Sequence, residues 1–278
     1  MLDSPMALSL PLQDQFETLF PYEHLCPVCG NILQLCSANA ISRELAHDWN
    51  LTAQQRRFFD YREGCTCKSC GSSVRRMNFA KVFLETINLQ HNEDIQFLCD
   101  LPTMTALDTI KIAEINNCGN LHSYFSVFPS LAYSEYGSNL PNVPSEDLMS
   151  LSYPDHQFDV VLTSDVLEHV PDYHRALSEI HRVLKLTGTL IFTVPWLSDR
   201  KTIARAKITP AGQIEHLQSP SYHGDYTLKL PDHLVFHEFG FDFVDVLNQF
   251  FETKIHCSNS FGGLIPSVFM CRKVTHTL

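Results

Sequence analysis

The chain lacks three features that would place it in simple functional classes. Among its 278 residues, 20 are lysine or arginine and 31 are aspartate or glutamate, which gives a formal net charge of −11. This acidic balance argues against broad, non-specific affinity for nucleic acid. No apolar run approaches the ~20 residues that a membrane-spanning helix needs. Residues 1–13 carry no basic stretch followed by an apolar core, so we predict no secretory signal and expect a cytoplasmic protein.

Cysteine, by contrast, is concentrated near the start of the chain, where six of the ten cysteines fall between Cys26 and Cys70. Two CxxCG turns pair Cys26 with Cys29 and Cys67 with Cys70. Two intervening residues let both sulfurs of a tight turn point at one ion, and two such turns supply the four thiolates of a tetrahedral zinc site. Four thiolates close the coordination shell, so we expect zinc in a structural role.

Two further thiols keep the ligand set open, because Cys36 lies between the two turns and Cys65 lies just before the second. The long gap between the turns predicts a helix at about residues 42–59. Arg62 and Arg75 flank the second turn, and we interpret them as part of a solvated basic surface.

The remainder of the chain alternates apolar runs with helical patterns, as open parallel sheets do. Residues 158–163 form an apolar run that ends in a polar corner, and a helix at 171–185 and a second run at 188–194 follow it. Ligands of such sheets bind beyond the carboxyl ends of the strands. Further strands are predicted at 109–115, 131–136, 253–257 and 267–271, a short strand or strand-like loop at 143–151, and helices at 79–90, 121–128 and 239–251.

This order of elements, together with the corner Thr163-Ser164-Asp165, resembles the class I S-adenosylmethionine-dependent methyltransferases over about residues 90–278. The segment from 26 to 76 resembles the zinc-binding region that precedes this fold in some bacterial enzymes. The resemblance implies an α/β protein with a seven-stranded Rossmann-like methyltransferase sheet and a small N-terminal zinc-binding module. We divide the chain into an N-terminal arm (1–20), a zinc-binding module (21–78) and a methyltransferase domain (79–278) with a substrate lid at about 198–238.

The same resemblance implies a set of cofactor-binding residues at the strand ends. In the family, an acid and a glycine-rich turn follow the first strand, whereas here the Gly-x-Gly pattern has become Asn116-Asn117-Cys118-Gly119. An acid that ends the second strand can accept hydrogen bonds from both ribose hydroxyls. The implied residues are Glu114, Asn116, Gly119, Glu135, Tyr136, Asp147, Leu148, Ser164 and Asp165. Glu146 competes with Asp147 for the adenine amino group.

Histidine suits proton transfer to or from an acceptor at neutral pH. His169 follows the corner after residues 158–163, and His223 lies in the expected lid within Tyr222-His223-Gly224-Asp225. We take both as candidate catalytic residues. The spacing of the lid histidines has no helical or knuckle pair, so we do not expect them to bind metal.

The resemblance therefore implies an S-adenosylmethionine-dependent methyltransferase. Its acidic charge and long lid favour a small-molecule acceptor, such as a metabolite or a sugar-linked or natural-product intermediate. Two alternatives stay open. One is an RNA-modifying methyltransferase that docks through Arg62, Lys68, Arg75 and Arg76, although we expect no nucleic-acid or membrane partner. The other is a binding protein without catalysis. The sequence predicts no oligomeric state.

Overall fold

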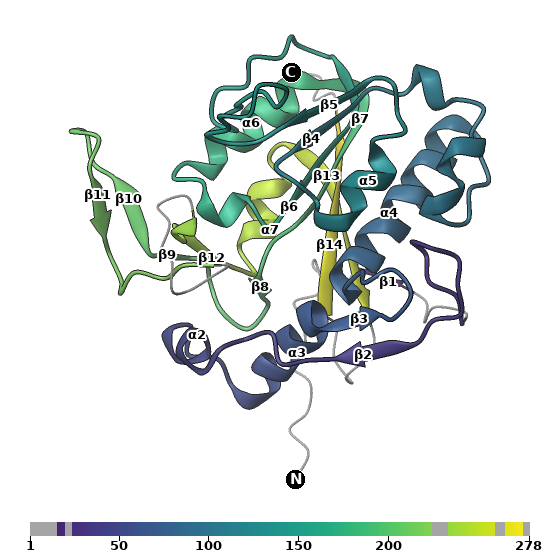
Figure 1. Ribbon diagram of the computed structural model, residues 1–278. Helices are drawn as coiled ribbons and strands as arrows, with labels where there is room; N and C mark the ends of the chain where they lie inside the picture. The colour runs from purple at the N-terminus through teal and green to yellow at the C-terminus, as the bar shows by residue number, and fades with distance from the viewer. Residues whose placement is uncertain (1–15, 20–23, 224–232, 259–264, 275–278) are drawn as a thin grey trace.

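A single seven-stranded sheet forms the centre of the protein (Figure 1). The computed structural model describes residues 16–19, 24–223, 233–258 and 265–274. The strand order is β1-β13-β14-β7-β6-β4-β5. In chain order these strands are β1 (Phe16–Leu19), β4 (Ile112–Ile115), β5 (Leu131–Ser134), β6 (Phe158–Ser164), β7 (Leu184–Thr193), β13 (Phe251–Ser258) and β14 (Ile265–Lys273). Strands β5, β4, β6 and β7 run parallel, and β14 lies antiparallel between β7 and β13. The predicted α/β methyltransferase sheet is confirmed.

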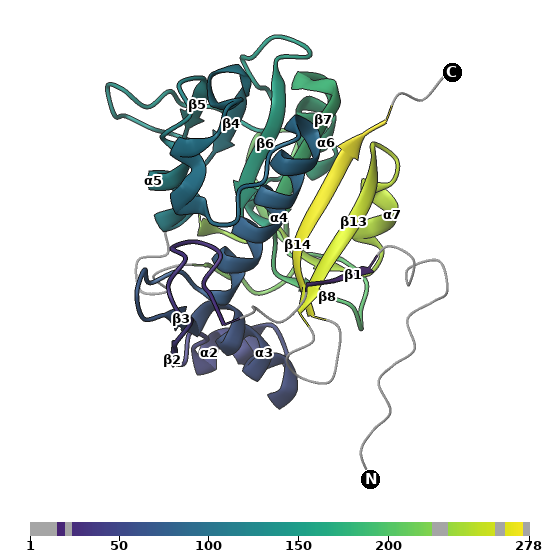
Figure 2. The same ribbon diagram turned by 90° about the vertical axis from the view of Figure 1, so that its right-hand side faces the viewer.

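Helices cover both faces of this sheet (Figure 2). The α4 helix (Val74–His91) and the short α5 helix (His122–Phe125) cover one face, and α6 (Tyr173–Val183) and α7 (Phe243–Leu247) cover the other. Along β6, Val160 and Leu162 pack toward α4 while Val161 packs toward α6. Because both faces are buried, the strand is continuously apolar rather than alternating.

The edge of the sheet beyond β5 differs from the simplest expectation. Residues 143–151 form only isolated bridges, in which Glu135 pairs with Ser145 and Asp147 with Ser150. Pro144 lies in this segment and has no backbone N–H to donate to a ladder. The segment is therefore the predicted strand-like loop. The seventh strand is instead β1, which pairs parallel to β13 at the opposite edge and falls in the expected N-terminal arm.

The helix predicted at 239–251 is shorter than expected and is preceded by a strand, β12 (His237–Gly240). This strand lies between β8 (Trp196–Leu197) and β9 (Ile203–Ala204). A side chain at Gly240 would place its Cβ 2.1 Å from the carbonyl oxygen of Arg200, so only glycine allows this approach. Tertiary pairing here overrides a helical pattern of apolar residues.

The N-terminal segment folds as two short helices rather than one. These are α2 (Arg43–Asp48) and α3 (Ala53–Gly64). The chain turns between them at Asn50, which has a φ of 48°, and Thr52 begins α3 with a capping box to Gln55. The linking helix α4 begins five residues earlier than its predicted start at residue 79, because Ser73 caps its first turn.

The remaining elements are small. They are β2 (Leu35–Ser37), β3 (Cys65–Cys67), β10 (Ala206–Ile208), β11 (Ile214–His216) and four 3₁₀ turns: η1 (Leu98–Thr103), η2 (Leu107–Thr109), η3 (Gly119–Leu121) and η4 (Leu167–His169). Among the helices that the structure describes, none combines the length and apolar character needed to cross a bilayer.

The N-terminal helices pack against the segment expected as a lid. Gln55 donates to Asp199 at 2.8 Å, Arg200 donates to the carbonyl of Trp49 at 3.0 Å, and the indole of Trp49 donates to the hydroxyl of Ser221 at 3.0 Å. These contacts join the cysteine-bearing N-terminal segment directly to the segment expected as a lid.

Candidate active site

A cavity of about 1120 Å³ lies at the carboxyl ends of β4, β5 and β6. Three parts of the chain line it. The sheet edge contributes Asn116, Glu135 and Asp165, the N-terminal helices and the turn between them contribute Arg62 and Trp49, and the segment expected as a lid contributes His223 among others. Strand ends of a parallel sheet meet at one edge, so residues that are distant in sequence share this space.

Most of the sequence-predicted cofactor residues line the cavity. The structure brings together Asn116, Glu135, Tyr136, Asp147, Leu148, Ser164 and Asp165. Glu114 and Gly119 lie outside the lining. Both predicted catalytic histidines, His169 and His223, also line the cavity, whereas Gly224 and Asp225 of the lid motif fall outside the described residues.

Glu114 is fully buried and holds the loop that follows β4. One carboxylate oxygen accepts from the backbone N–H of Cys118 at 2.8 Å, and the other lies 2.6 Å from Nδ1 of His122. At Gly119, which has a φ of 69°, an added Cβ would come within 2.5 Å of the Arg76 guanidinium. Both residues therefore shape the loop from behind rather than from inside the cavity.

The loop after β4 is tied to the loop after β5. Asn116 adopts a φ of 60°, which asparagine tolerates better than most residues, and its side-chain oxygen accepts from the backbone N–H of Tyr136 at 2.9 Å. The Tyr133 hydroxyl donates to Glu135. Burial, followed by this hydrogen bond to a carboxylate, raises the pKa of Tyr133 to about 12. The Glu135 carboxylate is thus fixed at the end of β5.

The carboxylates of Glu146 and Asp147 differ in their hydrogen bonds. The carboxylate of Glu146 accepts from the backbone N–H of Ser152 at 2.9 Å and from its hydroxyl, so both of its oxygens have partners. Asp147 accepts from the backbone N–H of Met149 at 2.8 Å through a single oxygen. This geometry favours Asp147 over Glu146 as a residue with an oxygen still available to a ligand.

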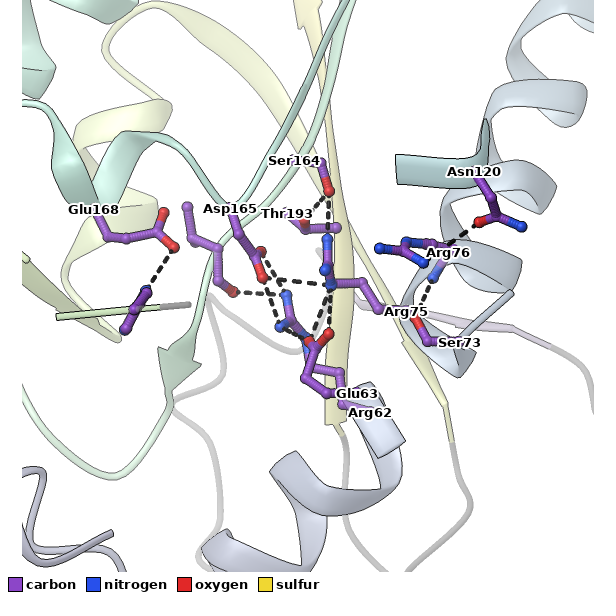
Figure 3. Close-up of polar contacts among 12 residues, drawn as sticks. Arg62, Glu63, Ser73, Arg75, Arg76, Asn120, Ser164, Asp165, Glu168 and Thr193 are labelled. Atoms are coloured by element: carbon purple, nitrogen blue, oxygen red, sulfur yellow. Dashed lines mark hydrogen bonds and ion pairs between the residues drawn. The ribbon is translucent and has the colours of Figure 1, made fainter. Parts of the chain in front are cut away.

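The corner after β6 is occupied by an ion-pair network (Figure 3). Arg62 donates to both oxygens of Asp165, from Nη1 at 3.0 Å and from Nη2 at 2.9 Å. Arg75 donates to Ser164 and, through Nε, to both oxygens of Glu63 at 2.9 and 3.0 Å. Although burial opposes ionisation of Asp165, the charges of Arg62 and Arg75 hold its pKa well below the usual range.

This network corrects the interpretation of the arginines as solvated surface. Arg62 is 3% exposed and Arg75 is 13% exposed. Two of the four residues considered for nucleic-acid docking therefore point into the protein, where carboxylates pair with them. The sequence places Arg62 and Arg75 beside the second cysteine turn. Neighbouring residues alone do not show whether their side chains point to solvent or into the protein.

The two candidate catalytic histidines face each other, with ring centroids 5.0 Å apart. His169 Nδ1 donates to the carbonyl oxygen of Leu234 at 3.0 Å, and burial lowers the pKa of His169, which keeps the imidazole neutral at neutral pH. Glu168, missed in the sequence analysis, lies behind them. Its Oε1 is 3.4 Å from His223 Nδ1 and 3.8 Å from His169 Nε2.

The four knuckle cysteines also come together. Sγ atoms of Cys26, Cys29, Cys67 and Cys70 all lie within 4.8 Å of one another, and the Cys26–Cys70 pair is 3.8 Å apart. The backbone N–H groups of Gly30 and Gly71, both at positive φ, close the turns onto the carbonyls of Cys26 and Cys67 at 2.9 and 2.8 Å. Four sulfurs at Zn–S of ~2.3 Å in a tetrahedron lie about 3.8 Å apart, so this donor set fits zinc.

Cys36 and Cys65 lie outside this group. Both belong to the antiparallel pair of β2 and β3, where Cys36 is opposite Thr66 and Cys65 is opposite Ser37. Cys36 hydrogen-bonds with the hydroxyl of Thr66 at 3.1 Å. The geometry therefore favours the four knuckle cysteines as the ligand set.

Comparison with known proteins adds a family to this geometry. Residues 130–192 match the profile of a family described as a methyltransferase domain. A glycine/sarcosine/dimethylglycine N-methyltransferase from Actinopolyspora halophila is 34% identical over 92 residues, which cover 33% of this chain and 16% of that protein. An uncharacterised protein from Methanocaldococcus jannaschii is 48% identical over 48 residues, which cover 17% of this chain and 21% of that protein. The chain thus spans about a fifth or less of the length of these curated relatives.

Among solved structures, an S-adenosylmethionine dependent methyltransferase from Mesorhizobium loti aligns at 14% identity with a TM-score of 0.37, over 62% of this chain and 94% of that one. The DszA carbon methyltransferase aligns at 16% identity with a TM-score of 0.37, over 72% and 53%. The family match itself runs from β5 through β6 and α6 into β7, the part of the sheet whose strand ends line the cavity. Over residues 130–192 the chain therefore carries a methyltransferase domain.

Proposed function

We propose that this protein transfers a methyl group from S-adenosylmethionine to a small-molecule acceptor inside the cavity. A lone pair of the acceptor attacks the methyl carbon, the carbon–sulfur bond breaks with its electron pair on sulfur, and the acceptor's proton passes to a base or to water. The sulfonium is already a good leaving group, so the enzyme mainly supplies alignment and removal of water. The observation that carries the proposal is the convergence of Glu135, Asp147 and Asp165 on one cavity.

The cofactor's place follows from the chemistry of these side chains. Glu135 is the proposed acceptor of hydrogen bonds from the ribose hydroxyls, and Asp147 with Leu148 is the proposed adenine site. Leu148 is 4% exposed and supplies an apolar surface for the ring. Asn116 and Tyr136 line the space between these groups, with Ser164 and Asp165 beside the methionine part. The side chains of Asn116 and Asp165 are already held by neighbours, which supports a preformed pocket.

A small acceptor is favoured by the size and the lining of the cavity. Ligand cavities commonly measure about 300–1,000 Å³, and a cavity of about 1120 Å³ leaves room for an acceptor beside the cofactor. Trp49 and Phe59 from the N-terminal helices and His223 and Phe236 from the lid segment face this space. A relative named as a glycine/sarcosine/dimethylglycine N-methyltransferase is consistent with an acceptor of this size.

His169 and His223 are the proposed acceptor-facing pair. In this role, either imidazole takes the acceptor's proton directly as a general base.

We further propose that the four knuckle cysteines hold one structural zinc ion. Zinc there would fix the start of α4 and the end of α3, from which Arg75 and Arg62 reach the corner after β6. The described cysteines are all unpaired thiols, which fits our expectation of the reducing cytoplasm as the protein's compartment.

Calorimetry with S-adenosylmethionine and with S-adenosylhomocysteine tests the cofactor proposal, and mass spectrometry of small-molecule mixtures incubated with isotopically labelled cofactor tests transfer. We expect saturable binding of both compounds and label in a small molecule. Absence of binding heat at millimolar cofactor would support the non-catalytic alternative. Salt-sensitive retention on immobilised RNA, with label entering RNA, would support the RNA-modifying alternative.

A further inference from the structure

We propose that Glu168, His169 and His223 form a second metal site, which binds a divalent transition-metal cation at the wall of the cavity. One ligand atom from each residue lies within 4.8 Å of the other two. The cluster is separate from the four cysteines and differs from them in chemistry. It also differs from the expectation that the lid histidines do not bind metal, which considered only sequence spacing.

The distances fit a shared ion. Two ligand atoms that each lie ~2.0–2.1 Å from a metal are separated by about 3.0 Å in an octahedral site and about 3.4 Å in a tetrahedral one. Oε1 of Glu168 is 3.4 Å from Nδ1 of His223 and 3.8 Å from Nε2 of His169. The first distance already matches a tetrahedral pair and the second exceeds it by about 0.4 Å, while the two histidine nitrogens lie within 4.8 Å of each other.

Glu168 supplies an independent reason to expect a cation. Its side chain is 0% exposed, and neither carboxylate oxygen has a hydrogen-bond partner among the described residues. Burying an ionised carboxylate costs several kcal/mol unless a charge or hydrogen bonds compensate. The imidazoles of His223 and His169 come within 3.4 and 3.8 Å of this carboxylate, and the more distant positive charge of Arg75 also acts on it without hydrogen-bonding to it. A bound cation compensates the carboxylate while both imidazoles stay neutral.

His169 is held as a metal-ligating histidine usually is, by a hydrogen bond from its other ring nitrogen. His169 Nδ1 donates to the carbonyl oxygen of Leu234 at 3.0 Å, which leaves the lone pair on Nε2, the nitrogen nearer Glu168. The ring of His223 packs on Trp49 at a centroid distance of 5.2 Å.

Backbone hydrogen bonds also join the chain segments that carry the three side chains. The bridge between Tyr222 and Leu234 sets His223 beside the segment that pairs with η4. On the other side, Phe236 donates its N–H to the carbonyl of Glu168 at 2.8 Å. Residues more than fifty positions apart are thereby fixed next to one another on a hydrogen-bonded framework.

The donor set narrows the kind of cation. Two imidazoles favour Zn²⁺, Fe²⁺, Co²⁺ or Ni²⁺ over Mg²⁺ and Ca²⁺, which prefer oxygen ligands. Three protein ligands leave coordination positions open, and both histidines line the cavity. If the cavity holds cofactor and acceptor as proposed above, the cation would polarise an oxygen or nitrogen of the acceptor. The two imidazoles would then act through the metal rather than as free bases.

Cobalt provides a direct test on the full chain. Purified protein is titrated with Co²⁺ in the absence of S-adenosylmethionine, and bound cobalt and zinc are counted after equilibrium dialysis. We expect one cobalt per chain beyond the metal held by the cysteines, without the thiolate-to-cobalt absorption that a cysteine site shows. Glu168→Gln and His223→Gln should each weaken this binding at least tenfold. His216→Gln, at an exposed histidine of β11, should leave it unchanged.

The outcomes separate this site from the methyltransferase proposal. Because metal is measured without cofactor, cobalt binding that depends on Glu168 and His223 supports the site even if no methyl transfer is found. No additional cobalt in the wild-type chain, or wild-type uptake in both variants, would overturn it. Zinc retained by the cysteines and an unchanged far-ultraviolet circular dichroism spectrum verify folding of each variant. If one variant does not fold, the other decides, because the two residues lie on different segments.

Discussion

Arg62 and Asp165, separated by 103 positions in the sequence, form a bidentate ion pair with N–O distances of 2.9 and 3.0 Å. The pair joins the end of α3 to the corner after β6. Arg62 also donates to the carbonyl oxygen of Val194 at 3.3 Å. The cysteine-bearing N-terminal segment thus reaches the floor of the cavity instead of standing apart from it.

Breaking this pair should destabilise the protein. Arg62→Met leaves the Asp165 carboxylate with only Arg75 as a cationic partner, and removal of one partner from a buried pair costs about 3–5 kcal/mol. Equilibrium urea unfolding measures the free energy of unfolding. Arg57→Ala, at an exposed arginine of the same helix, should change it by less than about 0.5 kcal/mol. Equal effects of the two substitutions would contradict a structural role for the pair.

The knuckle cysteines should control zinc content. Metal analysis of protein purified without added zinc should find a cysteine-bound equivalent that Cys67→Ser loses. Cys36→Ser should retain it, because the Cys36 sulfur lies outside the group of four. A lowered melting temperature should accompany the loss, since the metal ties both turns together. Less than about half an equivalent of zinc in a folded wild-type chain would rule out the zinc site.

Glu135→Gln should weaken binding of S-adenosylmethionine by about tenfold to a hundredfold. Hydrogen bonds to a charged group contribute about 1.5–3 kcal/mol, and the amide accepts less strongly than the carboxylate. Calorimetric dissociation constants are the measurement. Glu252→Gln, at an exposed position of β13, is the matched control. An unchanged dissociation constant in Glu135→Gln would remove this residue from the cofactor site.

Mild acid should destabilise the fold through His237. Its Nε2–H donates to the carbonyl of Pro171 at 3.1 Å, and burial lowers its pKa below the ordinary value of 6.5. In the unfolded chain the His237 imidazole therefore binds a proton more readily than it does in the native state. The free energy of unfolding consequently falls as pH drops below about 6.5. His237→Gln should flatten this dependence between about pH 7 and 5 in urea unfolding. His47→Gln, at a highly exposed histidine, should leave the pH dependence unchanged. An unchanged slope in His237→Gln would show that another group causes the acid destabilisation.

An element could be predicted from the sequence when its own adjacent residues determine its structure. Apolar runs such as β6 and β7 mark buried parallel strands because both faces are covered, and these were placed within a few residues. The helix expected at 239–251 was partly wrong, because its first residues are a strand held by β8 and β9. The spacing of apolar residues within one segment does not show that the segment pairs with a strand elsewhere in the chain.

The sequence by itself determined the two cysteine turns and the strand–corner–helix unit around Asp165, because a few adjacent residues and their spacing set that geometry. Only the tertiary structure decided that Arg62 pairs with Asp165 and that Glu168 lies beside His169 and His223. Those contacts depend on where separate segments return to the sheet edge. Burial there makes an uncompensated charge costly, so each charge's partner is set by the packing of the whole chain rather than by its neighbours in sequence.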